Sequence, residues 1–319
     1  MNKTILNDSE KFFRYSKFLQ DKFGAKVQKV SIDAGFTCPN LDGTINDKGC
    51  IYCNNSGFKP QYCSPEIPIE KQIGEGIKFF SRKQNYLYLA YFQSFTNTHT
   101  SPSILKEKLL KSANHNQIVG IIVSTRPDCV SKPIIDVLKE VSDIKEIMLE
   151  FGVESTDDQT LKFLNRGHTY RQVCEAVEIC NKEGFDTGIH LILGLPGENR
   201  TQILNHAKEI SKLPINSVKL HQLQIIKNTQ LGKMYEQNPE KFDLINWSDY
   251  VELCCDFVEL LRPDIAIERF ASMVPPSMLV VQNWEGVKNH HITHLIEKNL
   301  TERGSKQGEK YKGTMNFEK

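Results

Sequence analysis

The stretch QIVGIIVS, residues 117–124, is the clearest single indication of the fold. It is a short, unbroken run of aliphatic and β-branched residues, which is typical of a strand buried on both faces of a parallel sheet. Helical patterns lie on either side of it, at residues 102–111 and 133–141, and each begins with a proline. This part of the chain therefore predicts a repeating unit of one strand followed by one helix.

The same alternation continues outward in both directions. Strands are expected at residues 27–33, 86–92, 117–124, 144–153, 185–193, 217–224 and, as a possible last strand, 265–270. Helices are expected at residues 69–80, 102–111, 133–141, 157–164, 170–182, 200–213 and 247–261. Such a series predicts an α/β protein with a parallel sheet and right-handed crossovers, and we expect a barrel or a partial barrel. In that fold the functional site lies at the carboxyl ends of the strands.

Composition excludes several classes of protein. The 319 residues contain 40 Lys and Arg against 39 Asp and Glu, a formal net charge of +1, so neither an acidic tail protein nor a strongly basic nucleic-acid coat is expected. No apolar run approaches the roughly 18 residues of a transmembrane helix. Residues 1–20 lack the apolar segment of a secretory signal. We therefore expect a cytoplasmic protein.

A loop rich in cysteine follows the first expected strand. The chain has nine cysteines, and without an export signal they are expected to be reduced and available for metal. Residues 37–54, TCPNLDGTINDKGCIYCN, bring Cys38, Cys50 and Cys53 together in the pattern C-x11-C-x2-C. Thiolates bind zinc or an iron–sulfur cluster. A structural zinc ion is coordinated by four protein ligands. A [4Fe–4S] cluster held by three thiolates leaves one iron open for another ligand. Because the loop has three cysteines, it favours the cluster.

Polar or glycine-rich segments follow the other expected strands. They are YFQSFTNT (91–98), STRPD (124–128), EFGVEST (150–156) with NRGH (165–168) downstream of it, HLILGLPGE (190–198) and KLHQLQ (219–224). A solvated loop explains any one of them equally well. Because the carboxyl ends of parallel strands meet at one edge of a sheet, together they predict one large shared site.

The cysteine loop and the first five of these segments, in this order, resemble the radical S-adenosylmethionine (radical SAM) superfamily. They are most similar to its YhcC/YtqA-like group, which is related to the catalytic subunit of Elongator and to the tRNA methylthiotransferases. The long gap between the first two cysteines departs from the usual C-x3-C-x2-C. The resemblance covers residues 26–270 and implies a partial (β/α)6 barrel. Residues 1–25 and 271–319 are then short extensions, the second with a mobile, basic tail from Lys298.

The resemblance also implies the cofactors and their residues. A [4Fe–4S] cluster on Cys38, Cys50 and Cys53 binds S-adenosyl-L-methionine (SAM) at its open iron, and cleavage of SAM gives a 5′-deoxyadenosyl radical that abstracts a substrate hydrogen. The cofactor-binding residues that it implies are Tyr52, Ile192 and Leu195 beside the adenine, Gln93, Thr96 and Asn97 at the methionyl amino group, Glu154 and Ser155 near the ribose, and Arg166 near the carboxylate. Catalytic residues beyond the cluster ligands stay unknown at this point.

For the substrate, the resemblance implies maturation of the wobble uridine of tRNA. The step is the conversion of 5-carboxymethylaminomethyl(2-thio)uridine to 5-aminomethyl(2-thio)uridine, with a flavodoxin or ferredoxin-type electron donor. The 37 residues before Cys38 and the 49 after Phe270 are too few for a second-cluster domain or an acetyltransferase, so we expect neither methylthiolation nor acetyl transfer.

Several alternatives stay open at this point. A radical SAM enzyme acting on a small metabolite or a protein is one, and a non-enzymatic zinc-binding protein is a more remote one. Two further metal sites are also open. Cys63 lies ten residues after the cysteine loop, and His290, His291 and His294 share a helix face on which a polar surface is the simpler interpretation.

Overall fold

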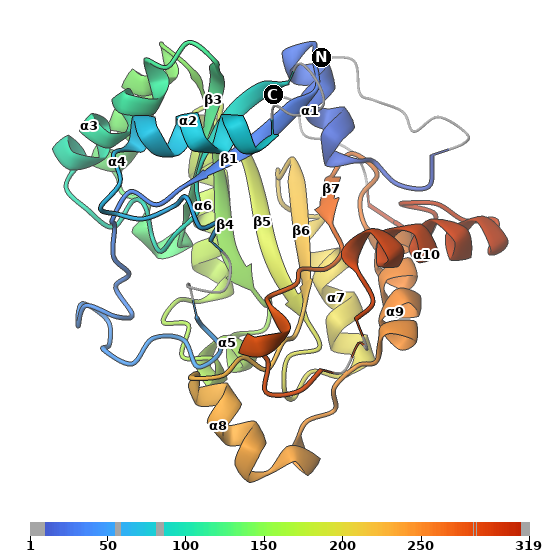
Figure 1. The fold of residues 1–319 in the computed structure, drawn as a ribbon. Coiled ribbons are helices and arrows are strands. Elements are labelled where there is room, and N and C mark those ends of the chain that lie inside the picture. The colour runs from blue at the N-terminus through green and yellow to red at the C-terminus, as the bar shows by residue number, and fades with distance from the viewer. Residues whose placement is uncertain (1–9, 55–58, 81–85, 283, 285, 314–319) are drawn as a thin grey trace.

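A single curled sheet of parallel strands forms the centre of the molecule. The computed structural model describes residues 10–54, 59–80, 86–282, 284 and 286–313. Within these residues seven strands are hydrogen-bonded in the order β1 to β7, and each neighbouring pair is parallel. Their bounds are β1 (Val27–Ile32), β2 (Leu87–Phe92), β3 (Ile118–Thr125), β4 (Glu146–Glu154), β5 (Asp186–Leu193), β6 (Ser217–Gln222) and β7 (Ala266–Arg269). The expected partial α/β barrel is confirmed, including its seventh strand (Figure 1).

Helices cover the outer face of the curled sheet. Those expected from the sequence are α2 (Ile69–Phe80), α3 (Pro102–Ala113), α4 (Lys132–Ser142), α5 (Asp158–Phe163), α6 (Tyr170–Lys182), α7 (Arg200–Ile210) and α9 (Trp247–Leu260). Three more are α1 (Tyr15–Phe23), α8 (Gln230–Gln237) and α10 (Asn289–Glu302). The sequence pattern does not predict α1 and α8 because each is short and buries only two residues, so neither has an apolar stripe.

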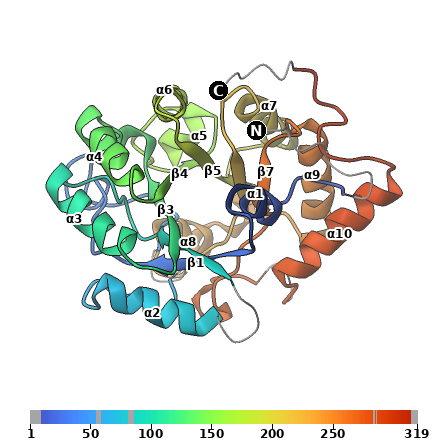
Figure 2. The same ribbon diagram turned by 90° about the horizontal axis from the view of Figure 1, so that it is seen from above.

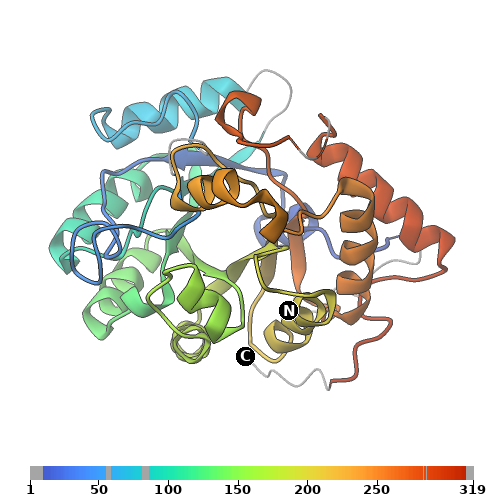
Figure 3. The same cartoon turned by 90° about the horizontal axis from the view of Figure 1, so that it is seen from below.

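The interior of the barrel is filled at its amino end. Helix α1 contacts the two edge strands, β1 and β7, and lies across the middle of the barrel when it is seen from above (Figure 2). An apolar cluster joins α1 and Phe13, two residues before it, to the inward-facing side chains of the strands. Its members are Phe13, Tyr15, Leu19, Leu89, Tyr91, Ile122, Met148 and Ala266. This cluster packs α1 against the amino end of the barrel, whereas Figure 3 shows the opposite end, where α8 and the loops that follow the strands lie.

The C-terminal residues correct one prediction. We expected a mobile basic tail from Lys298, but α10 runs through Glu302 and packs on α9. Beyond it, the side chain of Gln307 is 2% exposed and donates to the carbonyl oxygens of Arg262 and Ile265 at 2.8 and 2.9 Å. The boundaries at residues 25 and 270 stay predictions, although both extensions contact the barrel. No helix of the described residues is long and apolar enough to cross a membrane.

Candidate active site

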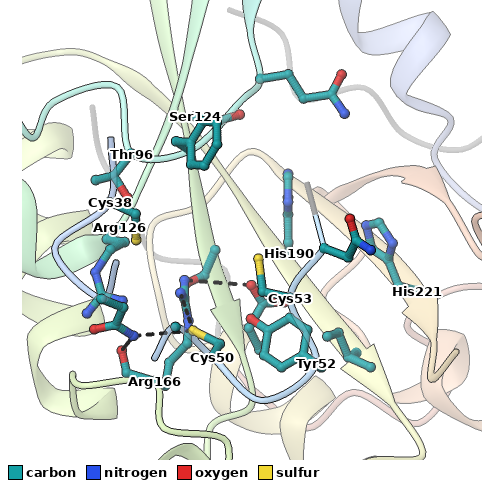
Figure 4. A pocket seen from close by; sticks show the side chains of 18 of the residues that line it. Cys38, Cys50, Tyr52, Cys53, Thr96, Ser124, Arg126, Arg166, His190 and His221 are labelled. Carbon is teal, nitrogen blue, oxygen red and sulfur yellow. Dashed lines mark hydrogen bonds and ion pairs between the residues drawn. The ribbon is translucent and has the colours of Figure 1, made fainter. Parts of the chain in front are cut away.

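The cysteine loop folds over the carboxyl end of the barrel. Cys38, Cys50 and Cys53 line one cavity of about 470 Å³, together with residues from the ends of the strands (Figure 4). Gly49 has a φ of +73°, which the turn before Cys50 requires. The amide of Asn165 then fastens this turn, because its Nδ2 donates to the carbonyl oxygen of Gly49 at 2.7 Å. The loop is thus held against the segment that follows α5.

Two side chains donate hydrogen bonds to the sulfur of Cys50. Nδ2 of Asn40 lies 3.3 Å from Sγ, and Nη1 of Arg166 lies 3.6 Å from it. Both donors are buried. N–H groups aimed at a cysteine sulfur stabilise its thiolate form, and they are one of the means by which proteins adjust iron–sulfur clusters. The donor set therefore fits a cluster ligand at Cys50.

The arrangement of the thiols bears on the choice between a single metal ion and a cluster. Among the residues that the structure describes, no three His, Cys, Asp or Glu side chains come together closely enough to hold one metal ion. A zinc ion draws its ligands to within about 2.3 Å of one point. The thiolates around a [4Fe–4S] cluster bind separate irons and stand farther apart. Three thiols around one cavity fit a cluster better than structural zinc.

Most of the cofactor-binding residues implied by the resemblance lie around this cavity. Those that line it are Tyr52, Gln93, Thr96, Glu154, Arg166 and Ile192. Glu154 and Arg166 face each other, with 3.6 Å between Oε1 and Nη2. Tyr52 and Ile192 belong to an apolar group that also contains Leu223. The cavity therefore has one polar wall and one apolar wall, as a ligand with a charged end and an aromatic ring requires. The individual roles stay predictions.

Three of the implied residues lie outside the lining of the cavity. Asn97 is fully buried, and its Nδ2 donates to three carbonyl oxygens, those of Phe92, Ser94 and Ser124 at 2.8–3.2 Å. Ser155 donates to Oε1 of Glu198 at 2.6 Å. Leu195 is buried in the apolar group behind Ile192. In the structure these side chains hold the loops in place, and the roles that the resemblance implies for them toward the cofactor stay predictions.

Backbone strain marks two cavity residues, one of which the sequence analysis did not single out. Phe95 and Glu154 both line the cavity and have φ values of 62° and 70°. Residues other than glycine rarely adopt this region, and such strain gathers at functional sites. At Glu154 a shift in the pairing of β4 with β5 accompanies it. An extra residue in a strand turns the following side chain, which here directs Glu154 to the cavity.

Below the cavity lies a layer of buried charges that the sequence analysis missed. Glu150 on β4 accepts hydrogen bonds from Lys29 on β1 and from Lys219 on β6, and both lysines also contact Glu268. The side chains of Lys219 and Glu150 are each 4% exposed. Burial acts to raise the pKa of Glu150, but the two ammonium groups outweigh it and hold that pKa well below its ordinary value. No pattern within one strand marks these residues as partners, because they lie on β1, β4, β6 and β7.

Two histidines and an arginine lie between this layer of charges and the cavity. Nε2 of His190 donates to Oε2 of Glu150 at 2.9 Å. Nε2 of His221 accepts from Nη2 of Arg269 at 2.9 Å, and its Nδ1 lies 2.9 Å from the hydroxyl oxygen of Ser272. Burial and the Arg269 guanidinium hold the pKa of His221 well below its ordinary value, so this imidazole is neutral. His190, His221, Arg269 and Ser272 all line the cavity.

The two further metal sites that the sequence left open receive no support. Cys63 is buried away from the cavity, where its thiol donates to the carbonyl oxygen of Ser31 at 3.0 Å. Burial raises the pKa of Cys63 to about 12, so it stays protonated. His290, His291 and His294 lie on α10, and within the described part of the chain they belong to no group that could hold a metal ion.

Comparison with known proteins agrees with this geometry. Residues 46–210 match the model of the radical SAM superfamily, and residues 215–302 match that of the radical SAM C-terminal domain. The chain is 32% identical over 305 residues to the uncharacterized protein YtqA of Bacillus subtilis, covering 95% of this chain and 93% of that protein. It is 24% identical over 204 residues to a tRNA uridine(34) acetyltransferase of Methanocaldococcus jannaschii, covering 63% of this chain and 36% of the other.

Among solved structures, the fold is similar to that of the Elp3 protein of Methanocaldococcus infernus. The TM-score is 0.67 at 17% identity, and the match covers 88% of this chain and 64% of that one. At this identity the likeness bears on the fold alone. It agrees with the partial barrel described above.

Proposed function

The chain belongs to the radical SAM superfamily, and on that premise we propose that this radical SAM enzyme modifies the wobble uridine of tRNA. The reaction is the conversion of 5-carboxymethylaminomethyl(2-thio)uridine to 5-aminomethyl(2-thio)uridine. The observation that carries the proposal is the cavity that Cys38, Cys50 and Cys53 share with the ends of the strands.

The family implies a [4Fe–4S] cluster and SAM, and the residues around the cavity fit both. Cys38, Cys50 and Cys53 would hold the cluster, with Asn40 and Arg166 donating to the Cys50 sulfur. When bound, the cluster and SAM supply a 5′-deoxyadenosyl radical, which can remove a hydrogen atom from the carboxymethyl carbon of the substrate. Loss of one further electron, which the oxidised cluster would accept, would give an imine, and water would hydrolyse it to the amine, so that the two-carbon unit would leave as glyoxylate.

The chain's own residues bind and orient the ligands of the cavity and exclude water from it. The apolar wall of Ile192, Leu223 and the ring of Tyr52 excludes water from one side of the cavity. On the polar side, Arg166 is fixed between Glu154 and the Cys50 sulfur, so it presents a rigid cation to a carboxylate. Beneath these walls, Glu150 pairs with Lys29 and Lys219 and so links β4 to β1 and β6 under the cavity.

Two considerations support a tRNA substrate. A relative at 24% identity bears a name that refers to uridine 34 of tRNA. The wobble base also lies in a single-stranded loop, and proteins commonly read such bases by turning them out into a pocket. A cavity of about 470 Å³ has the size of a small-molecule site and excludes a duplex, so a base could approach it only when turned out of its stack.

The test is turnover on defined tRNA. The anaerobically reconstituted enzyme is incubated with SAM, reductant and a tRNA that carries the carboxymethylaminomethyl group, and the nucleosides are measured by mass spectrometry. We expect loss of the starting nucleoside, gain of 5-aminomethyl(2-thio)uridine and formation of 5′-deoxyadenosine. We propose a flavodoxin or ferredoxin-type donor as the partner, so reduced flavodoxin should replace dithionite. An unchanged nucleoside beside abundant 5′-deoxyadenosine would sink the tRNA proposal and point to a small metabolite or a protein substrate.

A further inference from the structure

Arg269 is a half-buried cation on the wall of the active-site cavity. It ends β7 at the edge of the sheet and lines the cavity together with His221 and Ser272. Its Nη2 donates to the neutral imidazole of His221. Its Nε is buried and has no hydrogen-bond partner among the described residues. A buried donor without a partner is costly, so a group that accepts from it gains affinity.

The charge of Arg269 is not balanced by the protein around it. Within the described part of the chain, no carboxylate lies within the 4.0 Å of an ion pair with its guanidinium. Other buried arginines differ, since Arg126 pairs with Asp128 and Arg262 with Asp264.

The acidic side chains in the interior of the barrel, Glu150 and Glu268, already form ion pairs with lysines. Lys29 and Lys219 both contact Glu150 and Glu268, which makes two cations against two anions. That layer is neutral without Arg269. The wall of the cavity at β7 therefore carries one positive charge in excess, where burial strengthens its attraction for an anion.

We propose that Arg269, with His221 fixing its guanidinium and Ser272 beside it, is the subsite that binds a carboxylate of the substrate. The inference rests on the proposed function and deepens it, because the substrate proposed there differs from its product by a carboxymethyl group. A guanidinium matches a carboxylate with two parallel hydrogen bonds. Nη2 is held by His221, and the Nε edge lacks a partner among the described residues.

Two other anions compete for this position. The carboxylate of SAM is one, but Arg166 already stands beside the cysteine loop, and Figure 4 shows His221 on the side of the cavity away from Cys38, Arg126 and Arg166. A backbone phosphate is the other. Arg269 belongs to the strand and not to a rim loop, so a side chain that extends into the cavity meets it more readily than a backbone that stays outside.

The experiment measures binding without turnover. The reconstituted enzyme, with SAM but no reductant, is titrated with two forms of one tRNA, bearing either 5-carboxymethylaminomethyluridine or 5-aminomethyluridine at the wobble position. We expect wild type to prefer the first form. Arg269→Gln should weaken binding of that form by about 10- to 100-fold, the effect of one charged hydrogen-bonded pair, and leave the second form and SAM unchanged. Arg171→Gln is the control, because its side chain is 84% exposed on α6.

The other outcomes separate the possibilities. Equal weakening of both tRNA forms would assign Arg269 to a phosphate, and weaker SAM binding would assign it to the cofactor; each overturns the subsite. A preference that survives in Arg269→Gln overturns it as well. Equal binding of both forms by wild type overturns the subsite too, whereas the proposed function fails only if the turnover assay leaves the nucleoside unchanged. Arg269→Lys, which keeps the charge but not the paired donors, should retain part of the preference and exclude a folding defect as the cause.

Discussion

Inside the barrel, Nζ of Lys219 lies 2.8 Å from Oε2 of Glu150, and each side chain is only 4% exposed. The two residues come from β6 and β4, so this contact joins strands that are not neighbours in the sheet. Lys29 on β1 reaches the other oxygen of the same carboxylate. Glu150 thus links three strands across the interior, immediately below the candidate active site.

Removing Glu150 should destabilise the protein strongly. Glu150→Ala leaves Lys29 and Lys219 sharing only Glu268, and breaking a buried ion pair costs about 3–5 kcal/mol. We expect this loss in the free energy of unfolding, measured by urea titration with circular dichroism. Glu175→Ala, on the exposed face of α6, is the control and should change stability by about 0.5 kcal/mol at most. Equal stability of the two variants would show that the interior charges carry no net attraction.

The low pKa of Glu150 predicts how the free energy of unfolding depends on pH. The pKa of Glu150 is held well below its ordinary value in the folded protein, because the lysines outweigh the effect of burial. The unfolded chain therefore takes up a proton first as the pH falls, and the stabilisation is present above about pH 4.3 and lost below it. We expect the stability difference between wild type and Glu150→Gln to shrink as the pH is lowered through this region. A constant difference from pH 7 to pH 3 contradicts the assignment.

The cysteines of the loop should behave differently from Cys63. Replacing Cys38, Cys50 or Cys53 by Ala removes a thiol from the cavity, so each variant should lose most of its iron and sulfide after anaerobic reconstitution. Cys63→Ala should keep both, because that thiol is used in a hydrogen bond to Ser31. Iron analysis and electron paramagnetic resonance of the reduced protein, with and without SAM, give the readout. Zinc in wild type without a cluster signal would favour a structural zinc site.

The sequence predicted the parts of this site that lie close together along the chain. The cysteine loop with Tyr52, like Gln93 and Thr96 after β2, lies in short segments that resemble those of the family, and the structure places these residues around one cavity. The charged floor was not predicted. Lys29, Glu150 and Lys219 lie on three different strands that also contain other polar residues, and only the curling of the sheet turns them toward one another.

Arg269 was missed for a related reason. It belongs to a strand of four residues, which is too short for an alternating pattern to identify an inward-facing position. The order of the C-terminal segment was also not predictable locally. Gln307 contacts Phe13, which lies 294 positions away, and no pattern within a short window can reveal such a contact.

Gln307 provides a test of that C-terminal segment. Its Oε1 accepts from the backbone nitrogen of Phe13 at 2.8 Å, and its Nε2 donates to the carbonyl oxygens of Arg262 and Ile265. Gln307→Ala leaves these buried backbone groups without partners, which should cost about 1–3 kcal/mol in the free energy of unfolding. The neighbouring Lys306→Ala is the control, because Lys306 is exposed. If both variants unfold at the wild-type urea concentration, the segment contributes nothing to the fold.

A methyl group at Gly152 should disturb the cluster site without touching a cysteine. A Cβ atom there would lie 2.6 Å from Nη2 of Arg166 and 3.0 Å from Oε1 of Glu154. Gly152→Ala therefore displaces the guanidinium that donates to the Cys50 sulfur at 3.6 Å. Hydrogen bonds to cluster sulfurs change the reduction potential, and because they stabilise the added negative charge, losing one should lower it. We expect the variant to bind iron and sulfide normally, with a more negative midpoint in a redox titration followed by electron paramagnetic resonance.

The matched control for that change is Gly74→Ala on the outer helix α2. A Cβ atom at Gly74 meets nothing within 4 Å, and alanine in a helix interior is favoured over glycine by about 1 kcal/mol. This variant should keep the wild-type midpoint and gain a little stability. If Gly152→Ala also keeps the wild-type midpoint, Arg166 does not contact the Cys50 sulfur in the loaded enzyme. A lower midpoint in Gly152→Ala alone means that Arg166 acts on the cluster through its hydrogen bond to the Cys50 sulfur, since the substitution alters neither a thiol nor the charge of any side chain.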